Sequence, residues 1–93
     1  TAELVICTEV LEHVEQPLAV VLNARNASSR YVLFSCPVEE EIDGLFHVRM
    51  VTRGMLVAWA SEVGLKVVHQ EYLESAFNEK PHWHGWNFLL CEL

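Results

Sequence analysis

Two apolar runs with a helical segment between them constrain the fold of this chain most strongly. Leu4–Cys7 and Tyr31–Cys36 are continuous rather than alternating, which is typical of strands that are buried on both faces. Between them, Gln16 and Pro17 open a helix, because proline suits the first helical position. The residues that share one face of this helix are Leu18, Val21, Leu22 and Arg25. A strand, a helix and a strand within about 35 residues form a βαβ unit, which is parallel and right-handed.

The second half of the chain predicts one more helix and an antiparallel hairpin. Pro37 ends the second strand, and Thr52 is a suitable N-cap for a helix that Gly64 terminates. Apolar residues recur along that helix with i, i+3, i+4, i+7 spacing, at Leu56, Trp59, Ala60 and Val63. Leu65–Leu73 and Trp86–Leu93 are predicted to be two strands joined by a loop. The sequence therefore predicts an α/β fold in which a parallel pair of strands precedes a hairpin.

Charge and hydrophobicity exclude several classes of partner. The formal net charge is −7, and six scattered Lys and Arg residues are too few for a nucleic-acid interface, which must contact phosphates. No apolar run approaches the ~20 residues of a membrane span, and no signal peptide is present at this terminus, so we expect a cytoplasmic protein. Hydrophobic residues make up 52% of the 93 positions, which indicates a piece of a larger core or a subunit that covers surface against a partner.

Three cysteines lie in or at the end of the apolar runs, at Cys7, Cys36 and Cys91. Their number is odd and no Cys-x-x-Cys pair occurs, so a thiolate zinc site is not indicated. We expect buried, reduced thiols.

The stretch directly after the first strand carries the residues best suited to chemistry. Glu9, Glu12 and His13 are spaced i, i+3, i+4, so one helical turn would place all three on one face. The apolar residues between and after them would then point toward a core, namely Val10, Leu11 and Val14. Open α/β sheets keep their active sites at the carboxyl ends of buried strands. We therefore expect these three polar residues at the rim of an active site.

With these elements placed, the chain resembles the carboxyl-terminal half of a class I S-adenosylmethionine-dependent methyltransferase. Leu4–Val14 is similar to the fourth strand of that family and the following loop, including the common Leu-Glu-His-Val signature. Tyr31–Pro37 resembles the fifth strand, and His47–Arg53 followed by Gly64–Val67 resembles the segment around the next helix. The resemblance implies a partial Rossmann-like sheet with the strand order 4-5-7-6, covered by helices and ending in an antiparallel hairpin.

The resemblance also implies which parts of the family's cofactor site this chain contains. Residues 1–93 would be a single truncated domain that lacks the amino-terminal cofactor-binding half. The family's Gly-x-Gly-x-Gly loop and its acidic ribose-binding residue have no counterpart, because the glycines stand apart at Gly44, Gly54, Gly64 and Gly85. What is present would be the fourth-strand wall of the S-adenosylmethionine site, lined by Cys7, Thr8 and Glu9.

A narrower similarity concerns the metal-dependent small-RNA ribose 2′-O-methyltransferases, which share the Glu-x-x-Glu-His pattern and a later histidine. There the pattern implies Mg²⁺ or another divalent ion, and the ligands in this chain would be Glu9, Glu12, His13 and His47. Such an ion would lower the pKa of a substrate hydroxyl, so that its oxygen attacks the sulfonium methyl group. Two other interpretations stay open. One is a metal-free active site in which Glu12 and His13 are catalytic, and the other is a structural turn.

Three functions follow from the resemblance and its gaps. The first is transfer of a methyl group from S-adenosylmethionine to an oxygen or nitrogen of a small-molecule acceptor. The second is a non-catalytic module that dimerises or pairs with a separate amino-terminal half. The third is a fragment of an RNA ribose methyltransferase. Because the first strand would be an exposed apolar edge, we expect a second copy or the missing half to associate through Leu4–Cys7.

Two loops carry further polar residues. Glu39–Glu41 is predicted to be a solvated loop or a lid over a cationic ligand, and Arg49 and Arg53 are expected to pair with its carboxylates. His82 and His84 are expected in an exposed hairpin loop.

Overall fold

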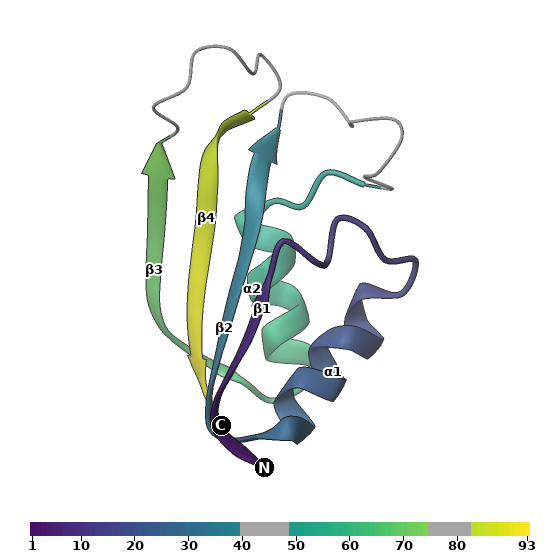
Figure 1. The fold of residues 1–93 in the computed structure, drawn as a ribbon, viewed down its shortest axis with the longest axis vertical. Helices are drawn as coiled ribbons and strands as arrows, with labels where there is room; N and C mark the ends of the chain where they lie inside the picture. The colour runs from purple at the N-terminus through teal and green to yellow at the C-terminus, as the bar shows by residue number, and fades with distance from the viewer. Residues whose placement is uncertain (40–48, 75–82) are drawn as a thin grey trace.

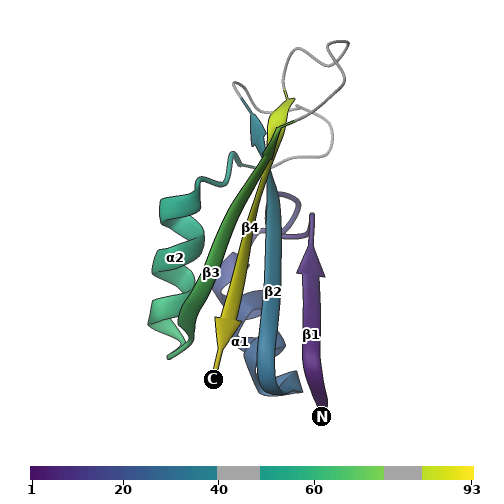
Figure 2. The ribbon, with the colours of Figure 1, turned by 90° about the vertical axis from the view of Figure 1, so that its left-hand side faces the viewer.

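The computed structural model describes residues 1–39, 49–74 and 83–93, and the elements below lie within these ranges. A twisted four-stranded sheet forms one layer, and two helices form a second layer on one face of the sheet (Figures 1 and 2). In chain order the elements are β1 (Ala2–Thr8), α1 (Pro17–Ala27), β2 (Ser28–Glu39), α2 (Arg53–Glu62), β3 (Lys66–Glu74) and β4 (Trp83–Glu92). Neither helix is long and apolar enough to cross a membrane.

The order of the strands in the sheet is β1-β2-β4-β3. The strands β1 and β2 are parallel, with Ile6 opposite Leu33, whereas β4 is antiparallel to both β2 and β3. The βαβ unit and the terminal antiparallel hairpin are thus confirmed. The order also corresponds, strand for strand, to the predicted order 4-5-7-6.

One face of the sheet and both helices enclose the core. Alternate residues of β1, β2 and β4 face the helices, and the buried ones are Cys7, Val32, Phe34, Cys36, Leu89 and Cys91. From α2, Leu56 and Ala60 are buried in the same cluster, and the predicted apolar face of this helix is confirmed. Continuous burial on this side fixes the register of the strands, because a slip by one residue would expose the whole row.

The prediction of the buried face of α1 is wrong, because the helix turns a different face toward the core. Val21 and Ala24 are buried, whereas Leu18 and Leu22 are 39% and 43% exposed. Apolar residues surround most of this helix, so the sequence pattern does not distinguish one face from another. Close approach to the sheet favours the small side chain of Ala24 over a leucine at the contact.

The prediction that Pro37 ends the second strand is also wrong, since β2 continues to Glu39 and Pro37 lies opposite Trp86. Proline is tolerated in strands where its missing N–H faces no neighbour. The last residue of β1, Thr8, lies opposite Ser35, so β2 is already an edge strand on that side when it reaches Pro37.

The ends of α2 follow their sequence signals. The Thr52 hydroxyl oxygen accepts a hydrogen bond from the Met55 N–H at 3.1 Å, which is an N-cap. After the helix, Gly64 has φ +79°, the left-handed conformation that commonly terminates helices.

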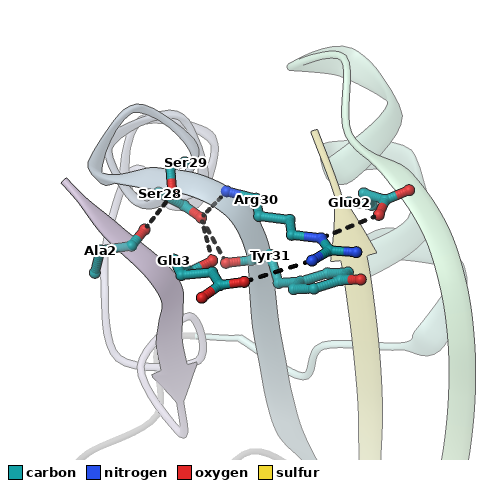
Figure 3. Close-up of polar contacts among 7 residues, drawn as sticks. All are labelled: Ala2, Glu3, Ser28, Ser29, Arg30, Tyr31 and Glu92. Carbon is teal, nitrogen blue, oxygen red and sulfur yellow. Dashed lines mark hydrogen bonds and ion pairs between the residues drawn. The ribbon is translucent and has the colours of Figure 1, made fainter.

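A polar network joins the strands at the amino-terminal end of β1 (Figure 3). The guanidinium of Arg30 lies over the ring of Tyr31 and between two carboxylates, those of Glu3 at 3.5 Å and Glu92 at 3.8 Å. The Ser28 hydroxyl donates to backbone carbonyls of Glu3 and Tyr31. This network fixes the end of the sheet that lies opposite the candidate site.

Candidate functional site

The carboxyl end of β1 leads into a turn that is tied to the neighbouring strand. The Glu9 N–H donates to the carbonyl oxygen of Ser35 at 3.0 Å, and the Ser35 hydroxyl donates to Oε2 of Glu9 at 3.2 Å. Glu9 has φ 56°, a left-handed conformation that is uncommon for residues other than glycine. Strained backbone of this kind persists where surrounding contacts enforce it, and it is frequent at functional sites. The link between Glu9 and Ser35 was not predicted, because no sequence signal pairs these two residues.

Residues 9–13 form turns rather than the predicted helical turn. The His13 N–H donates to the carbonyl oxygen of Val10 at 3.0 Å, which closes a tight turn over four residues. As a result Glu9, Glu12 and His13 do not share one face: Glu12 is 1% exposed, whereas the side chain of His13 is 40% exposed. The expected inward direction of Leu11 is confirmed, since it is fully buried.

The carboxyl group of Glu12 is the most unusual polar group of the turn. Both of its oxygens are buried, and neither has a standard hydrogen-bond partner among the residues that the structure describes, although the Cys36 thiol lies against the carboxyl group. Oε1 lies 3.3 Å from Nε2 of His13, so the carboxyl group supports the imidazole from the protein interior. A buried polar group without hydrogen bonds costs about 1–3 kcal/mol of stability, so its retention points to a role other than stability.

The thiols beside Glu12 are held in their protonated form. Burial raises the pKa of Cys7 and of Cys36 above the usual value, and the Glu12 carboxylate raises both further. Burial alone raises the pKa of Cys91 to about 11. All three cysteines are free and buried, which confirms the predicted reduced thiols, and none has the lowered pKa of a nucleophile.

Arg49 holds the turn from outside. Its guanidinium donates to three backbone carbonyl oxygens: Leu11 at 3.0 Å, Glu15 at 3.1 Å, and Val14. The predicted pairing with the carboxylates of Glu39–Glu41 stays a prediction, because those side chains lie outside the described residues. The second arginine, Arg53, donates to Oε1 of Gln70 at 3.5 Å.

The metal-ligand set is not assembled among the residues that the structure describes. Within them, no group of three His, Cys, Asp or Glu side chains could hold a metal ion. Glu12 is buried and Glu9 accepts a hydrogen bond from Ser35, while His47 lies outside the described ranges. The side chains of His82 and His84 lie outside them as well. The metal site predicted from Glu9, Glu12, His13 and His47 stays a prediction.

The three residues predicted to line the cofactor differ in what they can offer. Cys7 is buried and its side chain belongs to the core, so only its backbone is available to a ligand. Thr8 is exposed and Glu9 is half-buried at the carboxyl end of the parallel pair. Ligands of open α/β sheets bind at this edge, so these residues fit one wall of a cofactor site.

A shallow hollow lies elsewhere, between the start of α1 and the end of α2. It has a volume of about 650 Å³, and its apolar walls include Leu18, Leu22 and Val63. Glu9, Glu12 and His13 do not line it. Its position explains the exposure of the two leucines but brings no chemically active group to a ligand.

At the level of sequence, no family model and no curated protein matches the chain. At the level of structure, it is similar to the magnesium protoporphyrin IX methyltransferase ChlM of Synechocystis PCC 6803. The structure with bound SAM has a TM-score of 0.69 and 14% identity, and the match covers 97% of this chain and 38% of that one. The structure with bound SAH has a TM-score of 0.72 and 13% identity, and the match covers 97% of this chain and 44% of that one.

Two other structures are similar. BH2331 of Bacillus halodurans C-125, provisionally assigned as a methyltransferase, has a TM-score of 0.71 at 11% identity, over 97% of this chain and 63% of that one. The methyltransferase domain of bacterial CtHen1-CN has a TM-score of 0.55 at 17% identity, over 98% of this chain and 53% of that one. The chain thus spans between 38% and 63% of the length of these structures.

The fold is therefore that of part of a class I S-adenosylmethionine-dependent methyltransferase. The order β1-β2-β4-β3 is the order predicted for strands 4-5-7-6 of that fold.

Proposed function

We propose that this chain is the carboxyl-terminal part of a methyltransferase that moves a methyl group from S-adenosylmethionine to an oxygen or nitrogen of a small molecule. The observation that carries the proposal is the contact between the buried carboxyl group of Glu12 and the partly exposed imidazole of His13. A carboxyl group that orients and supports an imidazole at the edge of a site is an arrangement suited to general-base catalysis.

The proposed chemistry assigns one task to each group. When bound, S-adenosylmethionine supplies an electrophilic methyl group, and its transfer depends on alignment with the acceptor. Thr8, Glu9 and the backbone of Cys7 form the wall of the cofactor site. His13 would take the proton of the acceptor and Glu12 would stabilise the resulting imidazolium, while the cofactor, having given up its methyl group, would leave as S-adenosylhomocysteine. A positioned base of this kind contributes about 10²–10⁴-fold to the rate.

The proposed mechanism does not use the predicted divalent ion, and the experiment tests its effect by adding or omitting Mg²⁺. Glu9, Glu12, His13 and His47 remain the candidate ligands of Mg²⁺, and the fragment of an RNA ribose methyltransferase remains the corresponding alternative function. Since the described side chains do not gather as three ligands, we route no step through a metal.

The second candidate function is a non-catalytic module that dimerises, and the exposure of β1 favours it. Leu4 and Ile6 are 45% and 61% exposed on the face of the sheet that lacks helices. Two-fold pairing about Val5 would place Leu4 opposite Ile6 of the second copy, which joins both exposed side chains in one apolar stripe. We propose a second copy as the occupant of this edge. A polypeptide that supplies the rest of the sheet is the other outcome of the test.

The experiment is a methyl-transfer assay of the folded chain with labelled S-adenosylmethionine and a panel of hydroxyl and amine acceptors, with and without Mg²⁺. His13→Gln is expected to lower kcat about 10²-fold or more, because the base is lost. The matched control is His69→Gln, which breaks another His–Glu pair, 2.9 Å from Glu71 and exposed on β3. Full activity of His13→Gln would contradict the proposed base. Absence of transfer to every acceptor would contradict catalysis by this chain on its own.

A further inference from the structure

Besides its link to Ser35, the turn that carries Glu12 and His13 is held by a distant arginine side chain. Arg49 is 34 to 38 positions away in sequence, yet its guanidinium donates to the carbonyl oxygens of Leu11, Val14 and Glu15. The Nη1 atom donates to the oxygens of Leu11 and Val14, and Nη2 donates to that of Glu15. These carbonyls belong to a segment outside any helix or strand, so the arginine satisfies acceptors that no backbone ladder reaches.

The geometry requires arginine rather than a generic cation. A planar guanidinium presents its donors as a rigid fork, so it can hold several oxygens at fixed angles. Lysine carries a single compact ammonium on a flexible stem, so it would not fix the three oxygens at defined distances and angles. Hydrogen bonds from charged donors are also stronger than neutral ones.

The arginine is itself anchored to the scaffold. Two residues later Val51 is 4% exposed in the core, and Thr52 caps α2. The chain directly after Arg49 is therefore fixed by packing and by the helix cap. Arg49 therefore ties the turn to this fixed part of the chain. Its hydrogen bonds reach the carbonyls of Leu11 and Glu15, which lie on either side of Glu12 and His13 in the sequence.

We propose that Arg49 is a positioning residue for the Glu12–His13 pair: it holds the turn on the start of α2, so that the imidazole stays at the edge of the site. The significance of this role for catalysis rests on the proposed function. The structural part of the proposal, that the hydrogen bonds of Arg49 fix the turn locally, does not depend on it.

The experiment is hydrogen exchange of the whole chain, measured amide by amide with NMR, in the wild type, Arg49→Lys and Arg49→Ala. Loss of charged hydrogen bonds is expected to raise exchange of the His13 amide, which donates to Val10, by at least about tenfold in Arg49→Ala. Arg49→Lys is expected to fall between the two. Amides of β2 and β4 are expected to keep their wild-type exchange rates in Arg49→Lys. The matched control, Arg53→Ala, removes one exposed bond to Gln70 and is expected to leave the turn unchanged.

Two results would overturn the proposal. One is wild-type exchange of the turn in Arg49→Lys and Arg49→Ala. The other is a uniform acceleration across β2 and β4 in Arg49→Lys, which would mean that Arg49 contributes only to global stability. A failure of the proposed function would be seen separately, as a wild-type chain with a protected turn but without methyl transfer. If transfer occurs, the Lys variant is expected to lose kcat with little change in KM.

Discussion

At the scale of single residues, Glu12 is a buried carboxyl group to which we assign a chemical rather than a stabilising role. Its buried carboxyl group has no standard hydrogen bond among the described residues, and it lies near the buried thiols of Cys7 and Cys36. The sequence located Glu12 and His13 correctly as neighbours after a strand. It did not reveal that Glu12 points inward, because a tight turn and a helical turn place an i+3 residue differently.

Glu12→Leu is expected to raise the free energy of unfolding by about 1–3 kcal/mol, because an unpaired buried polar group is removed. Chemical denaturation at neutral pH measures this change. The control is Glu71→Leu, in which the replaced side chain is 53% exposed and the effect is expected to stay within about 0.5 kcal/mol. A destabilised Glu12→Leu protein would show that Glu12 has a stabilising partner, and would remove the argument for a functional carboxyl group.

The buried thiols predict a loss of stability in alkaline solution. Their folded-state pKa values lie above the unfolded value, and that of Cys91 rises from 9.0 to about 11. At a pH above the unfolded-state pKa, the thiols of the unfolded chain are deprotonated while those of the folded chain still hold their protons. The free energy of unfolding therefore falls as the pH rises from the unfolded-state pKa to the folded-state pKa. For each such thiol the fall approaches about 1.4 kcal/mol per pH unit.

Thermal unfolding under reducing conditions from pH about 8 to about 10.5 tests this prediction. The variant Cys91→Val is expected to show a shallower decline than the wild type, because one raised pKa is removed. Parallel declines of the two proteins would contradict the assignment to Cys91.

At the scale of elements, short sequence signals correctly predicted the helix ends, which depend on a few adjacent residues. The cap at Thr52, the stop at Gly64 and the proline at the start of α1 depend on a few adjacent residues, and all three are confirmed. The extension of β2 through Pro37 depends on where its neighbour ends, and the orientation of α1 depends on the sheet beneath it. Such features are set by tertiary contacts, which single-sequence patterns do not contain.

The hairpin of β3 and β4 depends on a glycine that only the structure explains. A Cβ atom at Gly85 would overlap the carbonyl oxygen of Leu73 and lie 2.9 Å from Cα of Glu74. Gly85→Ala is therefore expected to destabilise the fold by about 1–3 kcal/mol, because the neighbouring backbone must move. Chemical denaturation is the measurement.

The matched control is Gly54→Ala in the first turn of α2, where an added Cβ would meet, among the described residues, only the Thr52 hydroxyl at 3.8 Å. This variant is expected to be stabilised by about 0.5 kcal/mol, because alanine favours helix and restricts the unfolded chain. Equal effects of the two substitutions would contradict the close approach at Gly85.

At the scale of the whole molecule, the two edges of the sheet differ. The outer strand β3 carries charged residues and a register shift between Val67 and His69, which are features that discourage pairing. The other edge strand, β1, exposes Leu4 and Ile6 and is apolar through Cys7. Charge repulsion between copies, at −7 each, opposes association, so the apolar stripe must outweigh it.

We expect sedimentation velocity to show a monomer–dimer equilibrium that depends on protein concentration. Ile6→Lys is expected to shift it to monomer with the fold intact, because the side chain is 61% exposed. Leu73→Lys, 49% exposed on the opposite edge, is the matched control and is expected to dimerise normally. A wild-type monomer at every concentration would contradict the second copy as occupant, and the search would turn to a polypeptide that completes the sheet.

The central claim is that the carboxyl end of β1 is one wall of an S-adenosylmethionine site. The most direct test is to titrate the isotope-labelled chain with S-adenosylmethionine to millimolar concentration, with and without Mg²⁺, and to follow every backbone amide by NMR. We expect saturable shifts at Thr8, Glu9 and Ser35, extending through the turn to His13. A folded chain whose spectrum does not change, or changes only at the hollow lined by Leu18 and Val63, would contradict the claim.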